Sequence, residues 1–327
     1  MRRFALALCC LVLGSFGSIG VQSAASAAEC PGHPNALGTS RVLIVTPGEF
    51  TRLGKIQYPD SLPLNDHEVV LTFDDGPIPP YSSIVLDALA SECVKATYFL
   101  VGEMAHAYPS LVRRIYNAGH TIGTHSQDHP FAFQRLTAQQ VAQEVDRGIA
   151  SVDAALGDAR GVAPFFRIPG FGRTKSVENF LESKSLVTWS ADVVADDWFK
   201  GITAKEIVRK AMRRLDARGR GIVLLHDIHP ATAMAVPVLL RELKAGGYKI
   251  VQVVASGERP KSVPELVASG SDRTAWPRIV RTSATSSQSA LSAVRRHAGR
   301  LSSKHASADT KPISMESAYG WRTTVPQ

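Results

Sequence analysis

Between Glu68 and Ala255 the sequence alternates short apolar runs with longer amphipathic segments. The short runs are rich in β-branched and aromatic residues, which is typical of buried strands, and they occupy residues 69–73, 96–100, 120–124, 164–168, 186–191, 221–226 and 248–254. Segments with helical spacing of apolar residues lie between them, most clearly at 82–91, 109–118, 137–156, 203–217 and 234–245. This alternation predicts an α/β fold with a parallel sheet. Seven strands fit a (β/α) barrel one unit short of eight, and a doubly wound open sheet is the alternative.

Local signals predict where several of these helices begin and end. Thr137 stands at the start of a helical segment, and Gln140 lies three residues after Thr137, which is a capping-box pattern. Gly119 and the pair Gly246-Gly247 are expected to end helices, because glycine is favoured just beyond a helix C-terminus.

The N-terminus has the pattern of a secretory signal peptide over residues 1–28. Arg2 and Arg3 precede an apolar stretch, and small residues follow it where cleavage is expected. A membrane anchor is the alternative, but glycines and serines interrupt the stretch, which disfavours stable spanning. We therefore expect a secreted or periplasmic protein without stable membrane insertion after cleavage.

The rest of the chain divides into three segments. Residues 29–66 contain Pro, Gly and Asn around one apolar run at 41–45, and we expect an N-terminal extension that packs on the core. Residues 67–255 form the core domain. Residues 256–327 are dominated by Ser, Ala, Thr and Arg, a composition that predicts a disordered tail.

The formal net charge of +8 is concentrated outside the core domain. The tail has eleven Lys or Arg against five Asp or Glu, and the signal peptide adds two Arg, so the remainder sums to zero (8 − 6 − 2). The basic composition is therefore no evidence that the core binds nucleic acid or another polyanion. The tail could contact anionic envelope polymers, although a solvated tail is the simpler interpretation.

The cysteines indicate one disulfide. Cys9 and Cys10 lie in the signal peptide, so Cys30 and Cys93 remain in the mature chain. An even number of cysteines in an oxidising compartment predicts that these two are paired. Two buried free thiols are the alternative.

Two adjacent carboxylates follow the first core strand. Asp74 and Asp75 lie at its C-terminal end, directly before Gly76-Pro77. In a (β/α) barrel, active sites gather at this end of the strands. Adjacent side chains of an extended segment point in opposite directions, so the two carboxylates can serve different partners. An Asx-type turn before Gly-Pro is the structural alternative.

Two histidines with a four-residue spacing suggest what one of those carboxylates does. His125 and His129 follow another predicted strand, and in a helical turn both imidazoles could reach one ion. With one carboxylate they form a donor set that suits Zn²⁺, or another divalent ion, with a position left open for water. The other carboxylate would remain free as a base, which indicates metal-assisted hydrolysis. Non-haem iron oxygenases use a similar donor set, but the sequence shows no site for a cosubstrate.

At this point the chain resembles the polysaccharide deacetylases, the NodB-homology group of carbohydrate esterases (family 4). Five stretches resemble that family's motifs in the same order, namely 72–77, 125–129, 166–170, 189–198 and 222–227. The resemblance covers about residues 67–255 and implies a distorted (β/α)7 barrel as the catalytic domain.

The resemblance also implies a role for each matching residue. Asp75, His125 and His129 would hold the metal, Asp74 would be the general base, His226 the general acid, and Arg167 and Asp197 would orient the base and the acid. The residues support these roles independently, because His226 closes an apolar strand and would emerge at the same end of the barrel.

Two of the motifs depart from the family pattern. Ile168 and Gly170 stand where a second Pro and an aromatic residue are usual, so the amide near Gly170 that would stabilise an oxyanion is uncertain by one residue. The segment before Trp198 is two residues longer than usual, which leaves Asp192 and Asp196 as alternatives to Asp197. The expected groove residues are Pro169, Gly170, Phe171 and Trp198. His229 is expected in a turn before a helix at Pro230.

The implied activity is hydrolysis of N-acetyl groups from GlcNAc-containing glycans, with release of acetate. Chitooligosaccharide, peptidoglycan and exopolysaccharide all fit as substrates. An O-acetyl esterase and a non-catalytic glycan-binding relative are the alternatives, and the second is disfavoured because no metal ligand, base or acid is missing. The oligomeric state stays open.

Overall fold

The structure is a computed structural model that describes residues 30, 33–157 and 161–256. The predicted signal peptide and all of the predicted tail except Ser256 lie outside the described residues. Within these ranges, no helix combines the length and apolar character needed to cross a membrane.

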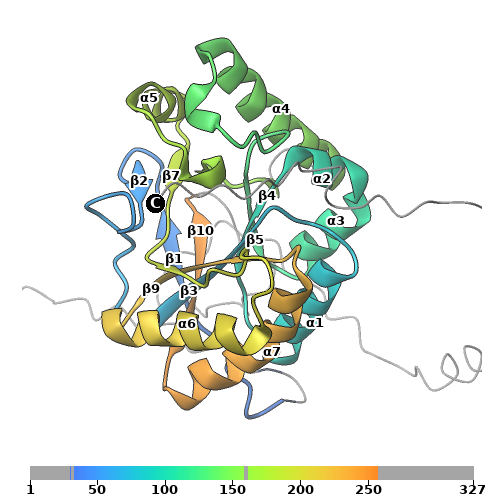
Figure 1. The fold of residues 1–327 in the computed structure, drawn as a ribbon, viewed down its shortest axis with the longest axis vertical. Helices are drawn as coiled ribbons and strands as arrows, with labels where there is room; N and C mark the ends of the chain where they lie inside the picture. Colours follow the sequence, from blue (N-terminus) through green and yellow to red (C-terminus); the bar gives the residue numbers. More distant parts are fainter. Residues whose placement is uncertain (1–29, 31–32, 158–160, 257–327) are drawn as a thin grey trace, which may run out of the picture. The chain divides into compact units, whose positions relative to one another are not determined.

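All seven predicted runs form strands, and helices lie around the outside of these strands (Figure 1). The strands from these runs are β3 (Glu68–Asp74), β4 (Thr97–Leu100), β5 (Thr121–Thr124), β6 (Phe165–Arg167), β7 (Val187–Trp189), β9 (Gly221–His226) and β10 (Lys249–Ala255). Three more strands are β1 (Thr39–Val45), β2 (Arg52–Leu53) and β8 (Val193–Val194). The helices are α1 (Tyr81–Ser91), α2 (Gly102–Ala107), α3 (Pro109–Asn117), α4 (Ala138–Leu156), α5 (Lys175–Ser183), α6 (Ala204–Arg218) and α7 (Pro230–Ala245), and short 3₁₀ turns cover Phe133–Arg135 and Pro169–Phe171.

The strand order is that of a distorted (β/α)7 barrel, as the sequence predicted. Strands β8, β9, β3, β4, β5, β6 and β7 follow one another through parallel pairing. Consecutive strands β7 and β8 are not paired with each other, so the barrel is open between them, and β2 pairs with the free edge of β7. This seam is the distortion.

The predicted strand at 248–254, which is β10, is not one of the seven barrel strands, although the strand count had included it. Strand β10 is not a member of the barrel series, because it pairs with β1 and with only the first two residues of β3, Glu68 and Val69. The seventh position belongs to β8, which has two residues. A strand this short has no periodicity that a sequence could reveal.

Side chains along β3 point alternately to two apolar clusters, and this alternation determines the side on which Asp74 lies. Val69, Leu71 and Phe73 belong to the cluster that packs against the helices, whereas Val70 belongs to a second cluster with Phe99 and Trp189. Side chains two residues apart share a face, so Thr72 and Asp74 lie on the side of Val70. Burial of a large apolar side chain stabilises the fold by about 1.5–3 kcal/mol.

The helix signals in the sequence are confirmed. The Thr137 side chain accepts a hydrogen bond from the backbone of Gln140, and the Gln140 side chain caps the backbone of Thr137 in return. Gly119 and Gly247 follow α3 and α7 with φ angles of 82° and 72°. A left-handed conformation of this kind favours glycine.

The N-terminal segment is joined to the core by a disulfide and an ion pair. Cys30 and Cys93 are bonded, which confirms the predicted disulfide. Nε and Nη2 of Arg41 on β1 each donate to one carboxylate oxygen of Glu68 on β3, at 2.7 Å. Burial by itself would raise the pKa of Glu68, but the stronger effect of the Arg41 hydrogen bonds lowers it to about 2.

Loss of the disulfide should destabilise the fold. It closes a loop with a sequence separation of 63 residues, and constraining a loop of that length stabilises a protein by about 4 kcal/mol in the chain-entropy model. Replacing Cys30 and Cys93 by Ser should lower the free energy of unfolding by about 2–5 kcal/mol, measured by urea denaturation. Reductant should lower the wild-type value and leave the double variant unchanged. Equal stability of oxidised and reduced wild type would contradict the prediction.

Candidate active site

The two adjacent carboxylates both approach His125, rather than diverging as an extended segment would place them. Asp74 is the last residue of β3, whereas Asp75 has a φ angle of 73° and leaves the strand geometry. Asp75 Oδ1 and Asp74 Oδ2 lie 3.3 and 3.7 Å from His125 Nε2. Both carboxylates are buried. The chain continues through Gly76, where an added Cβ atom would clash with the buried Asp227 carboxylate, so a larger residue would displace that side chain.

His125, His129 and Asp75 converge on one point. One possible ligand atom from each residue lies within 4.8 Å of the others. His125 Nδ1 donates to the carbonyl oxygen of Arg167 at 2.6 Å, so Nε2 keeps its lone pair toward the other two residues. His129 Nε2 lies 3.3 Å from Asp75 Oδ1.

The backbone between the two histidines is a bend, not the helical turn that the spacing suggested. Ser126 and His129 have φ angles of 67° and 49°. Ser126 Oγ accepts a hydrogen bond from the backbone N–H of His129 at 3.0 Å, which stabilises the bend. Both imidazoles still approach Asp75, but through left-handed backbone rather than through helix geometry.

The donor set fits a divalent metal ion. Asp75 Oδ1 is buried and has no hydrogen-bond partner among the described residues. Burial by itself would raise the pKa of Asp75, but the positive charge that His129 and His125 carry when protonated lowers it well below its usual range, so Asp75 ionises while these imidazoles are still protonated. Burial lowers the pKa of His129, which keeps its imidazole neutral. An ionised carboxylate and two neutral imidazoles are the ligands that Zn²⁺ prefers.

Arg167 holds Asp74 from inside the barrel. The guanidinium is fully buried, and Nη1 donates to Asp74 Oδ1 at 2.6 Å and to Thr72 Oγ1 at 2.9 Å. Nη2 donates to the carbonyl oxygen of Ser190 at 2.9 Å, and the guanidinium carbon lies 4.2 Å from the ring centroid of Phe99. A buried charge needs such compensation, so Asp74 Oδ1 is fixed while Oδ2 faces the histidines.

Asp197 holds His226 at the end of the neighbouring strand. His226 is opposite Asp74 in the pairing of β9 with β3. Its Nδ1 donates to Asp197 Oδ1 at 2.8 Å, and its backbone N–H donates to Asp197 Oδ2 at 2.7 Å. Burial by itself lowers the pKa of His226, but the Asp197 carboxylate raises it to about 10. The Trp198 ring lies edge-on to the imidazole, with centroids 5.5 Å apart.

Thr232 is a site residue that the sequence reasoning missed. Its Oγ1 on α7 donates to Asp197 Oδ2 at 2.7 Å and so helps to fix the carboxylate against His226. A threonine in the first turn of a helix gives no signal of this contact. His229 directly precedes α7, as expected, and its ring centroid lies 6.0 Å from that of His226.

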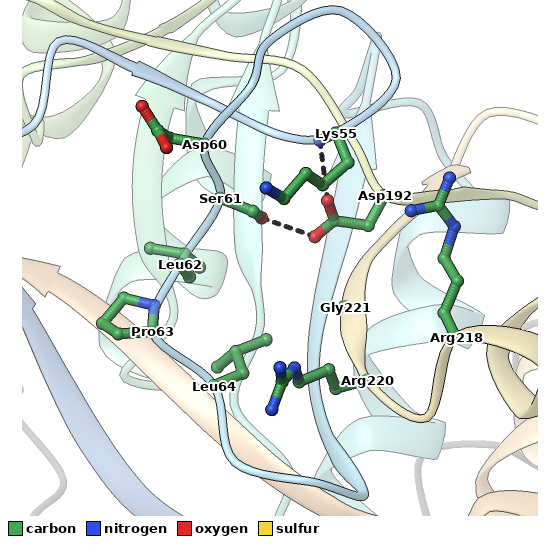
Figure 2. Close-up of a pocket in the computed structure, with 10 residues that line it drawn as sticks. All are labelled: Lys55, Asp60, Ser61, Leu62, Pro63, Leu64, Asp192, Arg218, Arg220 and Gly221. Carbon is green, nitrogen blue, oxygen red and sulfur yellow. Dashed lines mark hydrogen bonds between the residues drawn. The ribbon is translucent and has the colours of Figure 1, made fainter.

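The two alternatives to Asp197 have other partners. Asp196 accepts from Nη1 and Nη2 of Arg214 at 2.7 and 2.8 Å. Asp192 accepts from the backbone of Lys55 and from Ser61 Oγ, both at 2.7 Å (Figure 2), and from the backbone of Ile222 at 2.8 Å. The pocket in Figure 2 lies beside Gly221, the first residue of β9, whereas His226 is the last. It is therefore separate from the site described above.

Three of the four predicted groove residues, Pro169, Gly170 and Phe171, form a turn after β6, whereas Trp198 lies beside His226. Gly170 and Phe171 both have φ angles of 56°. The backbone N–H groups of Phe171 and Gly172 donate to the carbonyls of Ile168 and Pro169, so these two amides are engaged inside the turn. Gln57, which the sequence reasoning missed, donates from Nε2 to the Phe171 carbonyl at 2.8 Å.

Comparison with known proteins finds a matching family profile and relatives described as glycan deacetylases. Residues 62–188 match the profile of the family described as polysaccharide deacetylase. The chain is 36% identical over 185 residues to a peptidoglycan-N-acetylglucosamine deacetylase of Listeria monocytogenes, an alignment that covers 57% of this chain but only 38% of the relative. It is 34% identical over 212 residues to a peptidoglycan-N-acetylglucosamine deacetylase of Bacillus cereus, covering 62% of this chain and 72% of the relative.

A solved structure is also similar. The peptidoglycan deacetylase of Bdellovibrio bacteriovorus aligns with a TM-score of 0.59 and 28% identity, over 72% of this chain and 61% of that chain.

The donor set should bind a divalent ion only when both histidines are present. Titration of the metal-free protein with zinc chloride in a calorimeter should give one tight site, and replacing His125 and His129 by Ala should abolish it. His229→Ala is the matched control, because that histidine lies outside the triad, and its zinc binding should match wild type. Retained stoichiometric zinc in the double variant would exclude the triad.

Proposed function

Because the chain belongs to the polysaccharide deacetylase family, we propose that it is a metal-dependent hydrolase that removes N-acetyl groups from GlcNAc-containing glycans. One arrangement carries the proposal. Asp74 and His226, paired across β3 and β9, flank the donor set, and each is held by a buried partner of opposite charge. A base and an acid on adjacent strand ends fit amide hydrolysis.

Asp75, His125 and His129 would hold the divalent ion, and their donor set suits Zn²⁺. When bound, such an ion supplies Lewis-acid chemistry, because it polarises the acetyl carbonyl and makes a neighbouring water more acidic. The remaining steps are derived from the chain's own side chains.

Asp74 is placed to act as the general base. Arg167 engages its Oδ1, so Oδ2, which lies 3.7 Å from His125 Nε2, is the oxygen turned toward the donor set. It would accept a proton from the water that attacks the acetyl carbonyl. Because Arg167 fixes the carboxylate before the substrate arrives, the base needs little reorganisation.

His226 is placed to act as the general acid. Its Nδ1 is bonded to Asp197, which leaves Nε2 as the proton donor. With a pKa of about 10, the ring is protonated at neutral pH. The C–N bond breaks as Nε2 transfers its proton to the amine, and the products are acetate and a free glucosamine unit. The backbone N–H near Gly170 is our candidate for the group that stabilises the negative oxygen formed when water adds to the acetyl carbonyl.

The names of the relatives favour peptidoglycan among the possible glycans. The Listeria and Bacillus relatives are both described as peptidoglycan-N-acetylglucosamine deacetylases. A protein that modifies wall glycan works outside the cytoplasm, and the Cys30–Cys93 disulfide is consistent with an oxidising compartment.

Removing the charge of the base should abolish turnover and leave metal binding intact. Asp74→Asn should lower acetate release from peptidoglycan glycan strands by about 10²–10⁴-fold, because no group would then accept the proton of water. Zinc content should stay close to wild type, whereas the melting temperature should fall, because the neutral amide no longer compensates the buried charge of Arg167. Circular dichroism below the transition should confirm that the variant is folded at the assay temperature. Near-normal turnover would exclude Asp74 as the base.

Removing the charge of Asp197 should shift the pH profile. A general acid must be protonated, so activity falls as pH rises through its pKa. Asp197 raises the pKa of His226 to about 10, so in Asp197→Asn the alkaline limb of kcat should move to lower pH by more than about one unit. Asp196→Asn is the control, since Asp196 pairs with Arg214, and it should keep the wild-type limb. An unmoved limb in Asp197→Asn would contradict the assignment.

A further inference from the structure

Two exposed phenylalanines lie on the loops that carry the two halves of the site. The side chain of Phe131 is 73% exposed, and it follows the metal-ligand candidate His129 by two residues. Phe199 is 45% exposed and follows Trp198, which lies edge-on to His226. Neither residue has a role in the chemistry proposed above.

The strand order places these loops on opposite sides of the central strand. Phe131 follows β5 and Phe199 follows β8, and the series β8, β9, β3, β4, β5 puts β3 between them. Strand β3 ends in Asp74. One exposed ring therefore belongs to the side of the donor set and the other to the side of the acid.

Buried neighbours hold both loops in place. The turn with Phe131 continues into Phe133, which is fully buried and packs against Phe166 with ring centroids 6.2 Å apart. The carbonyl oxygen of Phe131 lies 3.9 Å from the position of a Cβ on Gly170, so this turn adjoins the groove turn.

Phe199 is likewise fixed. Its ring centroid lies 5.6 Å from that of Trp198 and 5.4 Å from Lys210 Nζ. Lys210 also donates to Asp196 at 3.0 Å, so the ammonium is itself held in place.

Exposed rings on loops that buried neighbours hold in place are suited to binding an amphipathic ligand. Single exposed apolar residues are common on protein surfaces, but these two are paired around one site. The C–H faces of a pyranose ring are apolar and flat enough to stack on an aromatic ring, while its hydroxyls remain in water. Such a contact buries apolar area on both partners without burying an unpaired polar group.

We propose that Phe131 and Phe199 are stacking platforms for the sugar units on either side of the reacting unit. The inference rests on the proposed function and deepens it: the protein acts on internal units of a glycan chain of at least three sugars and uses single units or disaccharides poorly.

The test compares a short and a long substrate. For wild type, kcat/KM for acetate release should be far higher on chitohexaose than on chitobiose. Phe131→Ala and Phe199→Ala should each lower kcat/KM on chitohexaose by about 10-fold, mainly through KM, and should change chitobiose turnover by less than about 2-fold. Phe131→Trp keeps a stacking surface and should retain the wild-type preference. Ile44→Ala removes an apolar side chain that is 60% exposed on β1, outside the site, and should have no effect.

A binding measurement separates failure of this inference from failure of the proposed function. In the Asp74→Asn background, calorimetry with chitohexaose and with soluble peptidoglycan glycan strands should show binding that each Phe→Ala change weakens about 10-fold. If wild type releases no acetate but both Phe→Ala changes weaken glycan binding, the proposed activity is wrong and the stacking role of Phe131 and Phe199 is supported. Wild-type affinity in both Phe→Ala variants would overturn the platforms, and so would equal losses on the short and the long substrate.

Discussion

The buried ion pair between Arg167 and Asp74 organises the site. A guanidinium without solvent access inside a barrel is unfavourable unless its charge is compensated. Here Asp74 supplies the opposite charge, and Thr72 and the Ser190 carbonyl accept further hydrogen bonds from Nη1 and Nη2, while Nε has no hydrogen-bond partner among the described residues. The backbone carbonyl oxygen of Arg167 also accepts a hydrogen bond from Nδ1 of His125. This bond determines that Nε2 of His125 faces the donor set. One residue of β6 therefore fixes the base, one metal-ligand candidate and the loop that follows β7.

The two sides of the proposed proton path are held by partners of opposite sign. A cation holds Asp74, and an anion holds His226. Arg167 fixes the orientation of the Asp74 carboxylate, and the Asp197 carboxylate raises the pKa of His226 and so favours the imidazolium that a general acid needs. The pairing of Asp74 with His226 across β3 and β9 keeps both groups at one end of the barrel.

Much of this could be predicted because the signals were local. Strand and helix patterns follow from periodicity, and adjacent residues reveal the Asp74-Asp75 pair and the His125–His129 spacing. The choice among Asp192, Asp196 and Asp197 could not be made on physical grounds from the sequence, since three acids within six residues differ only in their distant partners. Thr232 and Gln57 were missed for the same reason. The bend at 125–129 depends on left-handed residues that no helical spacing reveals, and β8 is too short to have a pattern.

The open seam of the barrel explains why the N-terminal segment belongs to the structure of the site. Strand β2 pairs with β7 at the edge that β8 leaves free. From the same segment, Ser61 and the backbone of Lys55 bond to Asp192, and Gln57 bonds to the carbonyl of Phe171 in the groove turn. Buried backbone and carboxylate groups along an unpaired edge need such partners. Through β2 the segment thus supplies backbone pairing to β7 that another barrel strand would supply in a closed barrel, and its Gln57 side chain bonds to the turn expected to contact the glycan.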